Sequence, residues 1–133
     1  MLDRLLEAGW RPGDQVILAA AGTRHPHAQR EVEAAAAMLS ALVGSRVFIG
    51  FAAPCRDGSG YPSVPDAVKW ARQAGASRVA VASYLLADGL FQGRLHEAGA
   101  DVVAAPLGSH PAVVRLACLR RRHAGVLAAA RAA

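Results

Sequence analysis

The sequence predicts an α/β fold with three layers, in which a four-stranded parallel sheet is flanked by helices on both faces. Short apolar segments typical of strands alternate with longer segments of helical periodicity along all 133 residues. Strands separated by helices are joined by crossover connections, which make the sheet parallel and are right-handed almost without exception. The length and the 53% hydrophobic composition suit one domain over residues 1–133, with residues 1–14 as a leading helix and connector.

The first half of the chain shows two strands and two helices. Leucines near the start predict a short helix that Gly9 ends, and Pro12-Gly13-Asp14 then turn the chain. Apolar residues at helical spacing predict a longer helix that ends at Gly44. The predicted elements are a helix over 2–9, a strand over 15–21, a helix over 27–43 and a strand over 46–52.

The second half repeats the alternation after a loop over 53–62, which is long enough to suggest a lid or mobile rim. Ser63 and Asp66 resemble a capping box at the start of the next helix, which Gly75 ends. A near-continuous apolar strand over 78–85 indicates burial on both faces. A short helix over 92–98 and a strand over 101–105 follow, and Pro111 is suited to open a last helix of about 15 to 20 residues.

Composition restricts the function classes. The net charge of +5 rests almost wholly on arginine, and outside Arg120-Arg121-Arg122 the arginines are scattered. With only 5% aromatic residues this argues against nucleic-acid binding. An uncharged apolar run of about 18 residues and a signal peptide are both absent, so we expect a cytoplasmic protein without membrane association. Cys55 and Cys118 predict free thiols, with Cys118 in the core.

Candidate functional residues follow the predicted strands, because the carboxyl ends of parallel strands meet at one edge of the sheet. His25 and His27 are the candidate metal ligands, although residues two apart do not share a helix face and Pro26 stiffens their link. A loop residue and the start of a helix explain His25 and His27 better than metal ligation does, and His110 before Pro111 is also better explained as part of a helix start than as a ligand. The whole edge offers Thr23, Arg24, His25, His27, Cys55, Asp57, Tyr84, Asp88, Ser109 and His110.

Nearly the whole chain resembles the sirohydrochlorin chelatases of the CbiX type. The resemblance lies in 16–26, 47–53, 62–75 and 78–91, and above all in 99–111, where Gly99-Ala100-Asp101 leads to Pro106-Leu107-Gly108-Ser109-His110-Pro111. It implies a class II chelatase-like half-domain of siroheme or cobalamin biosynthesis. Members insert Co²⁺ or Fe²⁺ into a polycarboxylated tetrapyrrole held between two such halves. The metal is thus a substrate, and the resemblance implies no covalently bound cofactor.

The residues that carry the family's chemistry are replaced in this chain. The resemblance places one histidine at Ala21, a second at Phe91 and an assisting acidic residue at about Ala53. A methyl group or a phenyl ring can neither ligate a metal ion nor accept a pyrrole proton. We therefore expect no catalytic residue in this half and no chelatase activity from the isolated chain.

The opening helix looks like the last helix of a preceding half, so the chain resembles the carboxyl-terminal half of a two-half chelatase. A second half, either an amino-terminal one or another copy in a homodimer, would then complete the cleft. The present chain would form the non-catalytic wall of that cleft. The alternatives are a stand-alone metal- or tetrapyrrole-binding protein that uses His25, His27 and Cys55, and a purely structural domain. The residues expected in the tetrapyrrole cleft are Gly22, Thr23, Arg24, Arg56, Tyr84, Gly89, Leu90 and Phe91.

Overall fold

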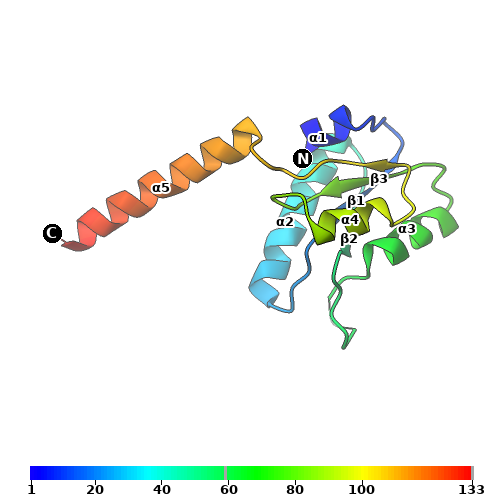
Figure 1. The fold of residues 1–133 in the computed structure, drawn as a ribbon, viewed down its shortest axis with the longest axis horizontal. Helices are drawn as coiled ribbons and strands as arrows, with labels where there is room; N and C mark the ends of the chain where they lie inside the picture. Colours follow the sequence, from blue (N-terminus) through cyan, green and yellow to red (C-terminus); the bar gives the residue numbers. More distant parts are fainter. Residues whose placement is uncertain (59, 133) are drawn as a thin grey trace.

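The computed structural model describes residues 1–58 and 60–132 and confirms the parallel sheet and its flanking helices (Figure 1). The strand order is β2-β1-β3-β4, and all neighbouring pairs are parallel. The elements are α1 (Leu2–Glu7), β1 (Gln15–Ala20), α2 (Pro26–Val43), β2 (Phe48–Phe51), α3 (Val64–Gln73), β3 (Val79–Ser83), α4 (Leu90–His96), β4 (Val102–Val103) and α5 (Pro111–Ala132).

Two apolar clusters lie on opposite faces of the sheet because successive strand residues point to opposite sides. On one face, Leu18 of β1 packs with residues of α1 and α2, including the fully buried Leu5. On the other face, Ile17 of β1 packs with residues of α3 and α4. The central strands β1 and β3 are therefore buried on both sides, as their apolar sequences predict.

The observed bounds differ from the predicted ones at β2, α4 and β4; β2 covers four residues, Phe48–Phe51, instead of 46–52. Helix α4 begins at Leu90, two residues earlier than expected, because Gly89 at φ 152° forms its N-cap in a backbone conformation that favours glycine. Strand β4 is shorter than the predicted 101–105, since the Asp101 side chain turns back to accept the Val79 N–H at 2.8 Å. The predicted cap of α3 is confirmed, with the Asp66 N–H donating to Ser63 Oγ at 3.2 Å.

The predicted rim loop over 53–62 lies at the carboxyl edge of the sheet, and its end is fastened to the body. The Phe51 N–H donates to the Pro62 carbonyl at 2.8 Å, and the Tyr61 hydroxyl donates to Glu33 Oε1 at 2.7 Å. Burial, followed by the carboxylate of Glu33, raises the pKa of Tyr61 to about 12. Ser59, which also belongs to the predicted loop, lies outside the described residues.

The last helix departs most from expectation. Helix α5 has 22 residues and projects away from the sheet (Figure 1). Cys118, predicted to be a core residue, is exposed on it. The physical reason is that α1 already covers this face of the sheet, where Leu5 joins a cluster with residues of β3 and β4. The sequence of α5 alone does not show that α1 covers the sheet face on which α5 would otherwise pack.

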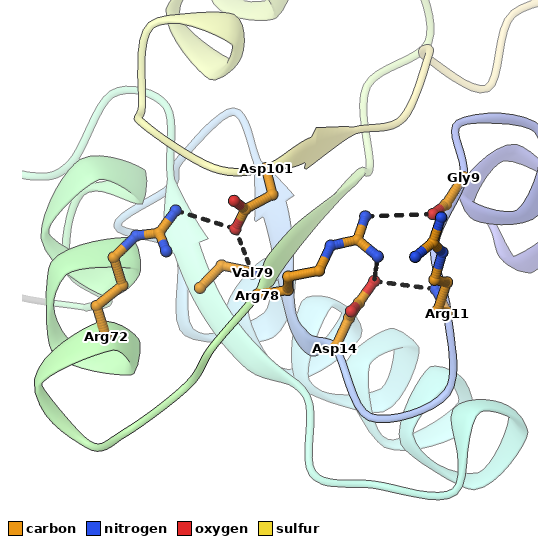
Figure 2. Close-up of polar contacts among 7 residues, drawn as sticks. All are labelled: Gly9, Arg11, Asp14, Arg72, Arg78, Val79 and Asp101. Atoms are coloured by element: carbon orange, nitrogen blue, oxygen red, sulfur yellow. Dashed lines mark hydrogen bonds and ion pairs between the residues drawn. The ribbon is translucent and has the colours of Figure 1, made fainter.

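A network of charged side chains joins the amino ends of β1 and β3 (Figure 2). Asp14, which is only 6% exposed, accepts the Arg11 N–H at 2.9 Å and forms an ion pair with Arg78 at 3.5 Å. Asp101 accepts Val79 N–H and Arg72 Nη2, the latter at 3.0 Å. The donated Val79 N–H is the largest cause of a lowered Asp101 pKa, and Arg72 lowers it further. These contacts fix the edge of the sheet opposite the candidate site.

Candidate functional site

The loops after β1 and β2 are joined backbone to backbone at the carboxyl edge. The Ala52 N–H donates to the Ala20 carbonyl at 2.8 Å, and the Ala53 N–H donates to the Ala21 carbonyl at 2.9 Å. Next to this pair, Gly22 has φ 117°, and a Cβ atom there would collide with the Ala53 carbonyl oxygen. Glycine is therefore required where the two loops meet, and its role is to allow this approach.

Two hollows flank Gly22 and Thr23. The larger is about 500 Å³ and includes both arginines that were expected in the cleft. The smaller is about 230 Å³ and lies beside Tyr84 and the start of α2. Gly22 and Thr23 line both. The larger hollow is lined by Gly22, Thr23, Arg24, Ala53, Pro54, Cys55, Arg56 and Asp57. The structure thus brings five of the eight expected cleft residues to two adjoining hollows.

The other three expected cleft residues lie on the neighbouring α4 segment and line neither hollow. Gly89 caps the helix, while Leu90 and Phe91 are 71% and 39% exposed. A buried network holds this segment: Ser83 Oγ donates to Gln92 Oε1 at 2.7 Å, and Gln92 Nε2 donates to the Ala104 carbonyl at 3.0 Å. Because Gln92 is fastened to β3 and to the chain after β4, the position of its neighbour Phe91 is fixed.

Arg94, which the sequence interpretation did not single out, links α4 to the candidate site although it lines neither hollow. Its guanidinium lies 5.7 Å from the centre of the Phe91 ring, and its Nη1 donates to the Ala52 carbonyl at 3.4 Å. It thereby connects α4 to the loop after β2. The available sequence signal is the spacing of three between Phe91 and Arg94, which places both on the same side of a helix.

The two candidate metal ligands are exposed and are not brought together with a third donor. The His25 N–H donates to Thr23 Oγ1 at 3.1 Å, which makes His25 part of the turn before α2. His27 Nδ1 lies 3.8 Å from Glu31 Oε1 on the same helix. Within residues 1–58 and 60–132, no three or more His, Cys, Asp or Glu side chains are grouped so that they could hold a metal ion. The interpretation of these histidines as turn and helix-start residues fits this geometry better.

The remaining candidates of this edge serve the fold or lie apart from the hollows. His110 Nε2 is 3.1 Å from Asp3 Oδ2, and its Nδ1 accepts the Ala112 N–H at 3.2 Å, so it caps the start of α5. Ser109 and Asp88 are exposed and line neither hollow. A separate apolar groove of about 500 Å³ runs along the β2 edge beside Phe48 and Trp70. Among the residues that line this groove, only Arg46 and Tyr61 carry ionisable side chains.

Two of the three positions at which the family resemblance expects catalytic side chains are joined by a backbone hydrogen bond. Ala21 and Ala53, where the family resemblance expects a histidine and an acidic residue, are the two residues that share the backbone hydrogen bond of 2.9 Å. Phe91, the third position, is fixed on α4. The side chains at these three positions are an alanine, an alanine and a phenylalanine.

Comparison with known proteins identifies the family. Residues 15–124 match the family CbiX. The matched range contains every strand and most of the helices. A comparison with curated proteins gives no significant match. None of the described helices is long and apolar enough to cross a lipid bilayer. The match covers far more than half of the 133 residues, and the chain therefore belongs to CbiX, the sirohydrochlorin chelatase family, with a role related to tetrapyrroles and metals.

Proposed function

We propose that this chain is a chelatase half that forms the non-catalytic wall of a sirohydrochlorin cleft, and that a second half supplies the catalytic histidines. The observation that carries the proposal is the hydrogen-bonded pair Ala21 and Ala53. Metal insertion requires a base for the pyrrole protons and ligands for the entering Co²⁺ or Fe²⁺. Neither alanine provides an atom for these steps, and neither does Phe91.

The side chains that surround this pair suit the binding of a flat ring with acidic arms. Leu90 and Phe91 present exposed apolar surface against which a macrocycle can lie. Arg24 and Arg56 line the larger hollow, where their guanidinium groups can pair with ring carboxylates. In this arrangement the chain binds and orients the tetrapyrrole, and the opposite half removes the protons and delivers the metal.

A cobalt-insertion assay tests the proposal. The chain alone is expected to convert sirohydrochlorin no faster than the buffer does, while the fluorescence of added sirohydrochlorin should still respond to binding. In the double variant Ala21→His/Phe91→His, insertion followed by absorbance should rise above the buffer rate, because a base and a metal ligand now face the bound ring. Insertion by the unmodified chain would overturn the proposal, and so would the absence of any sirohydrochlorin binding.

A stand-alone binding protein is the second candidate. Cys55 lines the same hollow as Arg24, so a tetrapyrrole could be held there without catalysis. Calorimetric titration with Co²⁺, Ni²⁺ and Zn²⁺ separates the two candidates. Sub-micromolar binding that is lost in His25→Ala/His27→Ala would favour the metal-binding function, whereas we expect neither variant nor parent to bind these ions tightly.

A further inference from the structure

The apolar groove beside β2 is separate from the candidate site at the carboxyl edge. It is lined mainly by residues of β2 and α3 and shares no lining residue with the larger hollow of Arg24 and Arg56. Its volume of about 500 Å³ lies within the range of small-molecule sites. Strand β2 is the first strand in the order β2-β1-β3-β4, so the groove opens along an edge of the sheet.

Two large aromatic side chains are exposed in this groove. Phe48 of β2 is 40% exposed, and Trp70 of α3 is 57% exposed. The other residues that line the groove from α3 and its end are Ala67, Ala71 and Ala74, whose methyl groups leave the space open. Aromatic side chains beside small ones suit a flat ring, because the ring stacks on the aromatic surfaces and excludes water from them.

Arg46 is the one charged side chain among the residues that line the groove. Its guanidinium lies 5.3 Å from the centre of the Phe48 ring, and no carboxylate of residues 1–58 and 60–132 forms an ion pair with it. The other ionisable group is the Tyr61 hydroxyl, which already donates to Glu33 and stays neutral at pH 7 because its pKa is raised to about 12. Charge complementarity therefore favours a ligand with an anionic group next to its ring.

The edge of β2 adds a backbone donor and acceptor to the groove. The Ala52 N–H donates to the Ala20 carbonyl of β1, whereas the Phe51 N–H points away from β1 and donates to the Pro62 carbonyl at 2.8 Å. Because alternate residues of a strand bond to opposite sides, the N–H and carbonyl of Ile49 point outward as those of Phe51 do. Within the described part of the chain, neither outward group of Ile49 is hydrogen-bonded, so both can pair with polar atoms of a ligand.

We propose that the groove beside β2 binds a small aromatic acid, whose ring lies against Phe48 and Trp70 and whose carboxylate pairs with Arg46. A peptide that adds a strand to the edge is a poorer occupant, because strand addition needs several residues with free backbone groups. Here the Phe51 N–H is already bonded to the chain's own Pro62, which leaves Ile49 as the one residue of β2 with a free outward N–H. The proposal does not depend on tetrapyrrole binding at the carboxyl edge.

Titration of the complete ¹⁵N-labelled chain with naphthalene-2-carboxylate tests the proposal. In ¹H–¹⁵N correlation spectra, the resonances of the Trp70 indole N–H and the Ile49 amide should shift with a Kd below about 1 mM. The indole N–H of Trp10, the other tryptophan, should keep its position because Trp10 does not line the groove. Naphthalene-2-carboxamide has the same rings without the charge, and it should bind about two- to fivefold more weakly.

Variants of the groove separate the contribution of the ring from that of the charge. Trp70→Ala should weaken binding of the naphthoate by about tenfold, because the ring loses an aromatic surface. Arg46→Gln should weaken it by about two- to fivefold and remove the preference for the acid over the amide. The matched control is Arg30→Gln, an exposed arginine of α2 that does not line the groove, and it should change neither affinity. All three side chains are exposed, so the circular dichroism spectra should match that of the parent.

Several outcomes would overturn the proposal. One is an unchanged Trp70 resonance at about 5 mM naphthoate. Equal affinities of the parent for the acid and the amide, or equal losses in Arg46→Gln and Arg30→Gln, would also overturn it. So would an Ile49 amide resonance that moves with protein concentration in the absence of the naphthoate, since a second copy of the chain would then cover the edge. None of these measurements involves a tetrapyrrole, so their outcome is distinguishable from that of the insertion assay.

Discussion

The two edges of the sheet are built in different ways. At the amino edge, charged side chains contact one another and the backbone, with Asp14, Arg78, Arg72 and Asp101 forming a network between β1, β3 and their neighbours (Figure 2). At the carboxyl edge, the loops are joined by backbone hydrogen bonds, and Arg24 and Arg56 are exposed beside the hollow. The charges of the first edge hold the fold together, whereas those of the second lie beside a hollow, where the proposed function assigns them to a ligand.

This difference indicates that side chains at the carboxyl edge can change while the fold of the family is kept. None of the contacts in the amino-edge network involves Ala21, Ala53 or Phe91. The backbone contact between Ala21 and Ala53 needs no particular side chain at either residue. Changes of the side chains at these two positions are therefore expected to cost little stability.

The largest expected effect is on stability at the amino edge. Asp14→Ala should lower the free energy of unfolding by about 2–4 kcal/mol, because the Arg11 N–H loses its acceptor and the Arg78 guanidinium loses its counter-charge. Urea unfolding followed by circular dichroism measures the change. Asp14→Asn is the control that keeps an acceptor and removes the charge. Its free energy of unfolding should lie between those of the parent and of Asp14→Ala. A loss below about 1 kcal/mol would contradict a structural role for this network.

A smaller and pH-dependent effect is expected at Asp101. Asp101→Asn should cost about 1 kcal/mol near pH 7, because a neutral amide accepts the Val79 N–H less strongly than a carboxylate does. The folded state lowers the pKa of Asp101, so its ionised form stabilises the protein above the ordinary aspartate range, and this contribution is lost as the pH falls through the lowered pKa. The difference in unfolding free energy between parent and variant should therefore shrink below about pH 4. A difference that stays constant down to acid unfolding would exclude this origin.

The smallest effect on stability is expected at the carboxyl edge. Arg24→Ala and Arg56→Ala should each change the free energy of unfolding by less than about 0.5 kcal/mol. Each should nevertheless weaken sirohydrochlorin binding by about two- to fivefold, as expected for exposed charge pairs. Fluorescence titration measures the affinity, and Arg46→Ala, an exposed arginine that lines the separate apolar groove, should leave it unchanged. Equal losses in all three variants would indicate an attraction that depends only on net charge.

The sequence was sufficient for the sheet and for the loops that meet at its carboxyl edge. Alternating strand and helix patterns predict the parallel sheet, and this topology brings the loop of Arg24 and the loop of Arg56 together. It was insufficient where a contact depends on a distant segment. Cys118 was placed in the core wrongly, because no local pattern tells that α1 occupies the face that α5 would cover. Arg94 was overlooked for the same reason, since its partner Ala52 lies 42 residues away in sequence.

The backbone contact between Ala21 and Ala53 has a consequence for how a ligand is received. Arg24 and Arg56 belong to two loops that are far apart in sequence, and independent loops would each have to be ordered by the incoming molecule. Because the two loops are hydrogen-bonded and Gly22 lets them approach closely, their relative position is already determined during folding. If the chain binds an anionic ring as proposed above, only the arginine side chains need to adjust, because the conformational entropy of the loop backbones is already lost on folding.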